Sequence, residues 1–363
     1  MAARTIVIDH GSGYMKAGFC GWNEPHLIFP SIVNYKPCKE NPGPSSAQRV
    51  LGLGIDIFHP DTFSYPIQRG RVLNWEGVEH MWSFVMETHR KGHEVSPVMF
   101  TECPLRRPAD RRKTLEIMFE SLCVPSLLLA DQMEMSLYAT GLLTGVVVDS
   151  GYGLTRVQPY YLGRPLQNGC RVLEFAGQDL STYLKKSLFR DDSSIPQVFR
   201  LQMADSIQFK QCYVPQNLGE AMDVLQSLPA GSDLKNVYQL PDGTTMDLTP
   251  MQRLAPEMFF SPEVFDLQVP SLSQALVDSI NVCEASLQPE LLSHVIACGG
   301  NTMYPGFSNR MSQELARNYP SGPKAIVKLG STRKYSVWMG ASIVAHLSTY
   351  KSEWMTKVEY DER

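Results

Sequence analysis

Short apolar runs that end at glycine-rich turns predict the main strands of this chain. Ile6-Val7-Ile8 comes directly before Asp9, and Val146-Val147-Val148 comes directly before Asp149. Each run is followed by Asp-x-Gly-x-Gly and a second apolar stretch, which is the pattern of a buried strand, a tight turn and a returning strand. One such hairpin is common, but two copies 140 residues apart (149 − 9) predict two related halves.

A third glycine-rich turn follows the apolar run 293–298. It reads Gly299-Gly300-Asn301-Thr302 and continues to Gly306, and a helical pattern begins near Phe307. Paired glycines after a strand let backbone N–H groups approach a phosphate or a nucleoside at the start of a helix. An ordinary strand-to-helix turn explains this segment taken alone, whereas three such turns in one chain favour a nucleotide site.

Between these turns, strand patterns alternate with helix patterns. Residues 98–101 and 126–130 predict strands, and residues 133–140 predict a helix. A further helix is predicted over 109–122, because its apolar residues recur at helical spacing. This alternation predicts an α/β fold.

Two segments rich in turn-forming residues interrupt the alternation of strands and helices. Residues 36–47 are rich in proline and serine and predict an exposed loop. Residues 228–244 contain Leu-Pro-Asp-Gly, which predicts a hairpin turn.

Composition narrows the class of protein. A chain of 363 residues predicts two to three domains, and 43% apolar with 19% charged residues is ordinary for a globular protein. The formal charge of −4 argues against nucleic acid or an anionic membrane as the main partner. No apolar run reaches the length of a membrane span, and the run near the N-terminus is too short for a signal peptide.

The eight cysteines show no Cys-x-x-Cys spacing and mostly sit inside apolar runs. This favours buried free thiols over disulfides or a zinc site. Free thiols are typical of a reducing compartment, so we expect a cytoplasmic protein.

The motifs of the chain resemble those of actins, in the same order and from residue 5 to residue 361. The matching segments are Asp9-x-Gly-Ser-Gly-x-x-Lys16, Phe29-Pro-Ser-Ile-Val33, Tyr65-Pro-Ile67, Thr101-Glu-x-Pro-Leu105, Ser136-Leu-Tyr-Ala-Thr-Gly141, Asp149-Ser-Gly-Tyr-Gly153, Gly299-Gly-Asn-Thr-Met-Tyr-Pro-Gly306, Arg333-Lys-Tyr-Ser-Val-Trp338, Leu347-Ser-Thr-Tyr350 and Glu359-Tyr-Asp361. The chain is similar above all to the divergent actin-like proteins of the vertebrate testis, which suggests a role in sperm.

The resemblance implies the actin/Hsp70/hexokinase fold, with two related α/β domains around a nucleotide cleft. The outer domain is expected at 1–139 plus 334–363, with a small subdomain at 31–65 that carries the polar loop 36–47. The inner domain is expected at 140–333, with a small subdomain at 177–263.

The resemblance also implies a nucleotide site, for ATP or ADP with Mg²⁺. Asp9 and Asp149 match the carboxylates around a hydrated Mg²⁺, and Gln132 with Asp149 matches the catalytic positions, Gln132 orienting the attacking water. The residues that match the phosphate loops and the nucleoside side are Gly11, Ser12, Gly13, Lys16, Gly151, Gly153, Leu154, Gly299, Gly300 and Lys334.

Several positions depart from the actin pattern. Tyr152 stands where actins have an acidic residue, and Arg156 stands where they have a histidine that helps the hydrolytic water. The Lys-Glu pair that flanks the adenosine in actins falls on Gln208 and Phe209, and an asparagine of the first loop is His10. An arginine stays protonated and cannot act as a base, so we expect slow or absent hydrolysis. Tyr152 and Phe209 remove hydrogen-bond acceptors for the ribose, so we also expect weakened nucleotide binding.

The polymer and partner surfaces give a further expectation. The loop 36–47 has no large apolar side chain to anchor in a neighbouring subunit, so we expect poor self-assembly. The residues that match the cleft where partner helices dock in actins are Tyr138, Ala139, Gly141, Gly163, Ile343, Val344 and Leu347, although Tyr138 and Val344 are equally compatible with the core.

Three functions stay open at this point. The first is a non-catalytic cytoskeletal or scaffold subunit of the cytoplasm that docks cytoskeletal or sperm-structure proteins and holds nucleotide structurally, with no nucleic-acid or membrane partner. The second is an active ATPase that polymerises, and the third is a subunit of a nuclear complex. The basic run 106–113 indicates a solvated helix face, with an acidic partner as the alternative.

Overall fold

The computed structural model describes most of the chain, which forms two compact units. The described residues are 4–36, 48–51, 63–90, 95–103, 107–189, 195, 197–227, 237–239, 243, 245–320, 322 and 325–362. Unit 1 comprises Met1–Leu143, Gly151–Gly153 and Gly330–Arg363, and unit 2 comprises Thr144–Ser150 and Leu154–Leu329. The short segment Gly151–Gly153 thus belongs to unit 1, although the strands on both sides of it belong to unit 2.

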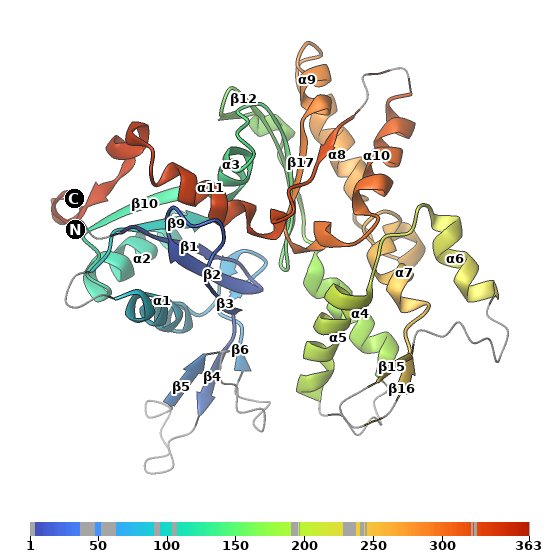
Figure 1. Cartoon of the computed structure of the whole chain (residues 1–363), viewed down its shortest axis with the longest axis horizontal. Coiled ribbons are helices and arrows are strands. Elements are labelled where there is room, and N and C mark those ends of the chain that lie inside the picture. Colours follow the sequence, from blue (N-terminus) through green and yellow to red (C-terminus); the bar gives the residue numbers. More distant parts are fainter. Residues whose placement is uncertain are drawn as a thin grey trace. The chain divides into compact units, whose positions relative to one another are not determined.

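The central sheet of unit 1 has the strand order β19-β10-β9-β1-β2-β3 (Figure 1). Its strands are β1 (Ile6–His10), β2 (Tyr14–Phe19), β3 (Leu27–Pro30), β9 (Val98–Glu102), β10 (Ser126–Asp131) and β19 (Met355–Thr356). The α-helices of the unit are α1 (Trp75–His89), α2 (Pro108–Glu116), α3 (Gln132–Tyr138), α11 (Ser336–Val344) and α12 (Lys357–Asp361). Strand β1 pairs in parallel with β9 and antiparallel with β2, so the sheet is mixed.

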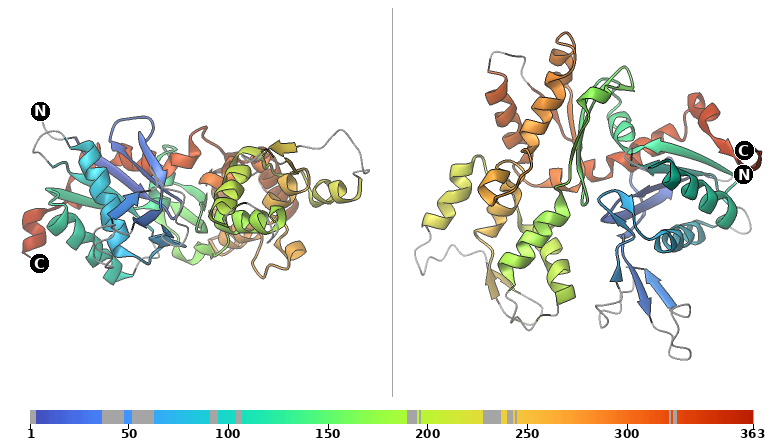
Figure 2. Two further views of the ribbon diagram at one scale, coloured as in Figure 1. Left: turned by 90° about the horizontal axis from the view of Figure 1, so that it is seen from below. Right: turned by 180° about the vertical axis from the view of Figure 1, so that it is seen from behind.

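Helices cover both faces of this sheet, and the alternation of side chains along β1 shows why. Ile6 and Ile8 pack in a core with Trp82 of α1, whereas Val7 between them packs in a separate core with Trp338 of α11. Successive residues of a strand point to opposite faces, so a strand buried on both faces is apolar at every position. Figure 2 shows the same layers from two further sides.

The sheet of unit 2 has the order β13-β12-β11-β17-β18, with β14 also paired to β12. Its strands are β11 (Gly145–Ser150), β12 (Thr155–Tyr161), β13 (Arg164–Pro165), β14 (Arg171–Leu173), β17 (Val295–Cys298) and β18 (Val327–Lys328). Its α-helices are α4 (Gly177–Leu188), α5 (Gln197–Gln211), α6 (Leu218–Ser227), α7 (Met251–Glu257), α8 (Leu272–Asn281), α9 (Gln288–Ser293) and α10 (Phe307–Asn318). Val146 and Val148 of β11 anchor the core between the sheet and these helices.

Smaller sheets extend the two units. Those of unit 1 are built from β4 (Val33–Lys36), β5 (Gln48–Leu51) and β6 (Phe63–Ser64) and from β7 (Ile67–Gln68) and β8 (Arg71–Val72), and that of unit 2 from β15 (Val237–Gln239) and β16 (Thr245–Asp247). Residues 37–47 of the predicted exposed loop lie outside the described residues, so that prediction stays a prediction. The antiparallel pairing of β15 with β16 agrees with the predicted hairpin.

The predicted strands are confirmed, as are the helices predicted over 133–140 and from Phe307, and the fold is α/β as expected. The predicted helix over 109–122 differs at its end. Helix α2 stops at Glu116, and the chain continues as a π-helical turn, Ile117–Ser121, which brings Met118 and Phe119 into the core.

The cysteines agree with the expectation only in part. Within the described residues they form no disulfide, and Cys103, Cys212 and Cys298 are buried. Cys123 is exposed instead, because it occupies a turn with positive φ just before β10. Nowhere in the described part of the chain is a helix both long and apolar enough to cross a bilayer.

Candidate functional site

The two glycine-rich hairpins carry the same cross-strand ion pair. In unit 1, Asp9 of β1 lies opposite Lys16 of β2, and their Oδ2 and Nζ atoms are 2.7 Å apart. In unit 2, Asp149 of β11 lies opposite Arg156 of β12, with Oδ2 and a guanidinium nitrogen 2.8 Å apart. The repeat is therefore Asp-x-Gly-x-Gly-x-x-Lys/Arg, and the shared basic position is a signal that the sequence analysis missed.

Asp9 is the centre of a buried polar cluster in unit 1. Its Oδ1 atom accepts hydrogen bonds from Thr101 Oγ1 at 3.0 Å and from Gln132 Nε2 at 3.2 Å. Gln132 is fixed because it begins α3, and the side chain of Asp131 caps that helix by accepting from the N–H groups of Met133 and Glu134. The structure thus brings the predicted Asp9, Lys16 and Gln132 together.

The tips of the two hairpins touch within unit 1. A Cβ atom on Gly13 would lie 2.6 Å from the Cβ of Tyr152, and a Cβ on Gly153 would lie 2.5 Å from the Oγ of Ser12. Ser12 Oγ also accepts from the N–H of Gly70 at 3.0 Å. Only glycine permits this approach, so the predicted loop residues Gly11, Ser12, Gly13, Gly151 and Gly153 form one turn cluster, while Leu154 is buried in unit 2.

The third turn lies in unit 2, beside the end of β11. Gly299 has a φ of +89°, and a Cβ there would lie 2.3 Å from the carbonyl oxygen of Ser150. The amide of Asn301 donates to Ser150 Oγ at 3.1 Å. The turn is thus held tightly against the hairpin that contains Asp149.

Gln208 and Phe209 occupy different environments at this turn. Gln208 is fully buried, donates to Tyr304 Oη at 2.7 Å, and accepts from Ser181 Oγ. It is therefore a core residue whose amide is already hydrogen-bonded within unit 2. Phe209 is 41% exposed, and its ring edge lies within 3.5 Å of where a Cβ on Gly300 would stand. An aromatic ring, which accepts no conventional hydrogen bond, thus lies beside the turn that is expected to contact the nucleoside.

Lys334 is the predicted nucleoside residue in unit 1. Its side chain is exposed, and its Nζ atom lies 4.7 Å from the centre of the Tyr335 ring. Gly299 and Gly300 belong to unit 2, so the structure places these three predicted residues on different units.

The two carboxylates expected near Mg²⁺ are not free to act as its ligands. A hydrated Mg²⁺ is held by one or two carboxylates, and it keeps several waters. Here both expected carboxylates are paired with a cation of their own hairpin, and Asp9 is only 2% exposed. The described residues include no group of three or more His, Cys, Asp or Glu side chains that could hold a metal ion.

The predicted docking residues separate into surface and core. Ile343 and Leu347, in and just after α11, are each 45% exposed, whereas Val344 is 1% exposed and packs with Val7 and Trp338. Val344 is therefore a core residue, which is one of the two alternatives that the sequence left open, because the turn of the helix directs it towards the sheet. Gly163 belongs to unit 2.

Tyr138 of α3 is half-buried. Its hydroxyl donates to Glu134 Oε1 at 2.7 Å. Burial raises the pKa of the tyrosine, and hydrogen bonds to Tyr350 and Glu134 add to this rise. Ala139 is half-buried as well, and Gly141 is exposed. The C-terminal end of α3 is therefore accessible to solvent.

The basic run is largely neutralised within unit 1. Arg106 lies outside the described residues. Arg107 pairs with Asp110 at 3.0 Å, Arg111 pairs with Glu102 at 3.2 Å, and Lys113 pairs with Glu116. These ion pairs fit the solvated helix face, which is one of the two alternatives that the sequence left open.

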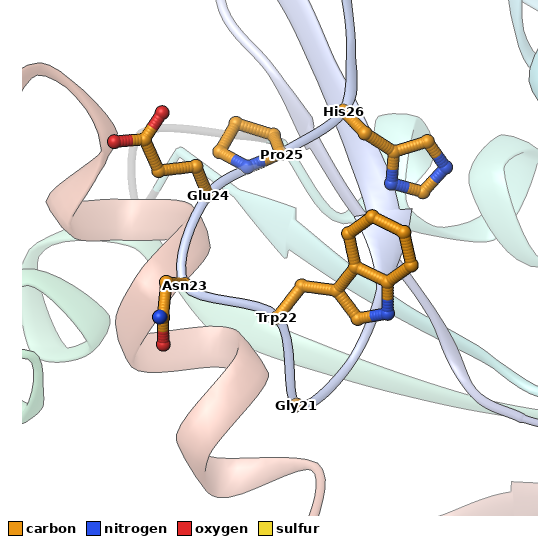
Figure 3. A pocket seen from close by; sticks show the side chains of 6 residues that line it. All are labelled: Gly21, Trp22, Asn23, Glu24, Pro25 and His26. Atoms are coloured by element: carbon orange, nitrogen blue, oxygen red, sulfur yellow. The ribbon is translucent and has the colours of Figure 1, made fainter.

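An open pocket of about 570 Å³ lies at the turn between β2 and β3, lined by Gly21–His26 (Figure 3). In Figure 3, the Trp22 ring lies beside the His26 ring, and Glu24 points away from both. The Nε2 atoms of His26 and His89 are 2.9 Å apart, and the Nδ1 of His89 bonds the carbonyl oxygen of Val85 at 2.7 Å. This pair ties the turn to α1.

We expect the histidine pair to make stability depend on pH. Burial lowers the pKa of both His26 and His89, and for His89 the charge of His26 adds to this. Below about pH 6.5 the unfolded chain takes up protons that the folded chain resists. The free energy of unfolding should therefore stay constant above that pH and fall as the pH drops below it. Most of this fall should come from buried His89, because solvent screens exposed His26.

Urea unfolding of the whole chain between about pH 7.5 and 5.5 measures this effect. The variant His26→Gln/His89→Gln should show a flatter dependence than the parent, and His294→Gln in unit 2 is the matched control. An equally steep fall in the double variant would contradict the assignment.

Comparison with known proteins agrees with this geometry. The sequence matches the Actin family over residues 2–363. It is 64% identical to human Actin-like protein 8 over 362 residues, which cover 100% of this chain and 99% of that protein. Because both similarities extend over the whole chain, this protein belongs to the actin family.

Proposed function

We propose that this chain is a non-catalytic actin-like subunit, which docks protein partners and holds ATP or ADP as a structural ligand. The observation that carries the proposal is the ion pair between Arg156 and Asp149. At this position actins have a histidine that helps the hydrolytic water. A guanidinium cannot accept a proton at neutral pH, so it cannot act as a base there.

Retention of nucleotide is supported by the turn geometry of each unit. Unit 1 offers Lys16 and the backbone of a glycine turn cluster, and unit 2 offers the Gly299-Gly300 turn. Backbone N–H groups in such turns bind phosphate well. Any Mg²⁺ that enters with the nucleotide neutralises phosphate charge, and the residues expected near it are Asp9 and Asp149.

Binding should be weaker than in an actin that keeps its nucleoside contacts. Gln208 is committed to the core, and Phe209 replaces an acceptor with a ring. Each lost hydrogen bond is worth about 0.5–1.5 kcal/mol. Two such losses weaken binding from several-fold to about a hundred-fold.

Partner docking is supported by the exposed apolar side chains of unit 1. Ile343 lies in α11 and Leu347 follows four residues later, just after the helix ends, and both apolar side chains are exposed to a partner helix. We propose cytoskeletal or sperm-structure proteins as the partners and the cytoplasm and cytoskeleton as the location. Poor self-assembly rests on the polar composition of the loop 36–47.

An active, polymerising ATPase is the second candidate. It is favoured by the contact between Gln132 Nε2 and Asp9 Oδ1, because this places an amide that can orient water beside the first hairpin.

The nucleotide content of the purified protein, measured together with ATP turnover in Mg²⁺, separates these functions. The proposal expects bound ATP or ADP near one per chain and turnover no higher than that of a Gln132→Ala variant. Turnover that depends on Gln132 would overturn the non-catalytic assignment and support the ATPase. A folded protein that contains no nucleotide would overturn the structural role of ATP or ADP and leave only the docking function.

A further inference from the structure

We propose that Arg156 makes nucleotide binding by this chain independent of Mg²⁺, so that metal-free ATP is a full ligand. This inference rests on the proposed nucleotide function. It follows from the charge of the unit 2 hairpin, from the burial of the ion pair, and from the different charges of ATP with and without the metal.

The charge of the hairpin is the first step. Asp149 and Arg156 are cross-strand partners at the position that Asp9 and Lys16 occupy in unit 1. Each hairpin therefore contributes one carboxylate and one cation and has no net charge from this pair. A neutral histidine at residue 156 would instead leave the unit 2 hairpin with one negative charge.

The burial of the pair is the second step. The side chains of Arg156 and Asp149 are 6% and 13% exposed, and their charged atoms are 2.8 Å apart. Water screens a pair at this depth much less than a surface pair. Strand pairing on both sides of Arg156 fixes it, because β12 pairs with β11 and with β14. The carboxylate of Asp149 therefore stays compensated.

The charge of the ligand is the third step. Metal-free ATP carries two more negative charges than its Mg²⁺ complex. An uncompensated aspartate repels the metal-free form more strongly, and that repulsion is one reason a site needs the metal. With Asp149 neutralised by its own arginine, this repulsion is absent from the unit 2 hairpin. The two forms of the nucleotide should then bind with similar affinity.

Calorimetric titration of ATP into the full chain, with Mg²⁺ and with EDTA, tests the inference. It is done at about pH 9, because the neighbouring carboxylate of Asp149 raises the pKa of a histidine at residue 156 above its ordinary value. The parent should bind both forms within about threefold. Arg156→His should bind the metal-free form at least about tenfold more weakly than the Mg²⁺ complex, since one uncompensated charge at short range is worth at least that factor.

Two further variants isolate the charge of residue 156. Arg156→Lys keeps the cation and should keep the parent's ratio of affinities. Arg164→His removes an arginine from β13 of the same sheet and should also leave the ratio unchanged. Thermal unfolding of each variant confirms that it is folded before titration.

Each remaining result counts against the inference. ATP that binds the parent only with Mg²⁺ would overturn it and leave the proposed nucleotide function standing. An unchanged ratio in Arg156→His, or a changed ratio in Arg156→Lys, would show that the charge of residue 156 is not the cause. Absence of binding in both conditions would overturn this inference and the nucleotide function together.

Discussion

Replacing Gly340 by alanine should destabilise unit 1 by about 3 kcal/mol or more, which is the reverse of the usual effect of this change in a helix. Gly340 lies in the middle of α11 and is buried. In an exposed helix interior, glycine to alanine stabilises by about 0.5–1 kcal/mol, because alanine loses less backbone entropy on folding. Helix propensity therefore predicts the wrong sign here.

The reversal comes from the packing of α11 on α3. A Cβ on Gly340 would stand 1.8 Å from the carbonyl oxygen of Met135 and 2.6 Å from its carbonyl carbon. These are backbone atoms inside α3, so no rotamer change removes the clash and the helices must separate. Separation would loosen Trp338, whose indole N–H donates to the carbonyl oxygen of Val7 in the central sheet at 3.1 Å.

Urea unfolding of Gly340→Ala, followed by tryptophan fluorescence, measures the loss. Gly219→Ala in α6 is the matched control, because there the nearest atom is the end of an asparagine side chain at 3.0 Å. The control should change the free energy of unfolding by less than about 1 kcal/mol. If both variants behave alike, the close packing of α11 on α3 is refuted.

The same two helices carry the proposed docking surface. Tyr138 ends α3, and Ile343 and Leu347 lie in and just after α11. A variant that separates the helices should weaken partner docking even though residue 340 itself is buried. The close packing of α11 on α3 at Gly340 thus helps to position the exposed residues of the proposed docking surface.

The local features of the fold could be predicted from sequence, because they depend on residues near one another in the chain. Ile6-Val7-Ile8 and Val146-Val147-Val148 are strands buried on both faces, and the glycine turns after them stand where the pattern predicts. The pairing of Asp149 with Arg156 could also be predicted from sequence. Both residues lie in one hairpin, seven positions apart, as Asp9 and Lys16 do.

What could not be predicted depends on which way a side chain faces in three dimensions. Ile343 and Val344 are adjacent and both apolar, yet one is exposed and the other is core. Gln208 is polar, but it is fully buried because Tyr304, about a hundred residues along the chain, supplies its hydrogen-bond partner. Sequence periodicity gives no signal for a partner that distant.

A buried ion pair in unit 2 is another contact between distant residues that the sequence does not predict. Arg310 of α10 and Glu257 of α7 are 2% and 0% exposed. Two guanidinium nitrogens of Arg310 donate to the two carboxylate oxygens of Glu257, at 2.7 and 2.8 Å. A further bond to the carbonyl oxygen of Pro215 at 3.3 Å joins a third segment to the pair.

Arg310→Met should therefore lower the free energy of unfolding of unit 2 by about 3–5 kcal/mol, since it leaves the carboxylate of Glu257 buried without a counter-charge. The double variant Arg310→Met/Glu257→Leu removes both charges and should recover most of that loss, because a buried pair contributes little beyond its own desolvation. Urea unfolding of the parent, both single variants and the double variant gives the coupling energy directly. Additive losses in the double variant would show that the two side chains do not act as a pair.

The effect of the same variants should be visible in the turn 299–306. Arg310 lies in the first turn of α10, directly after Gly306, and the carbonyl oxygen of Pro305 accepts from the N–H of Val214 at 2.8 Å. The ion pair thus fixes the end of the Gly299–Gly306 segment against the chain that follows α5. In Arg310→Met, hydrogen exchange of the amides between residues 299 and 306 should accelerate, and in the double variant it should slow again towards the parent. Exchange at the unit 1 hairpin around Gly11 should be unchanged in both variants, which distinguishes loosening of this turn from unfolding of the whole chain.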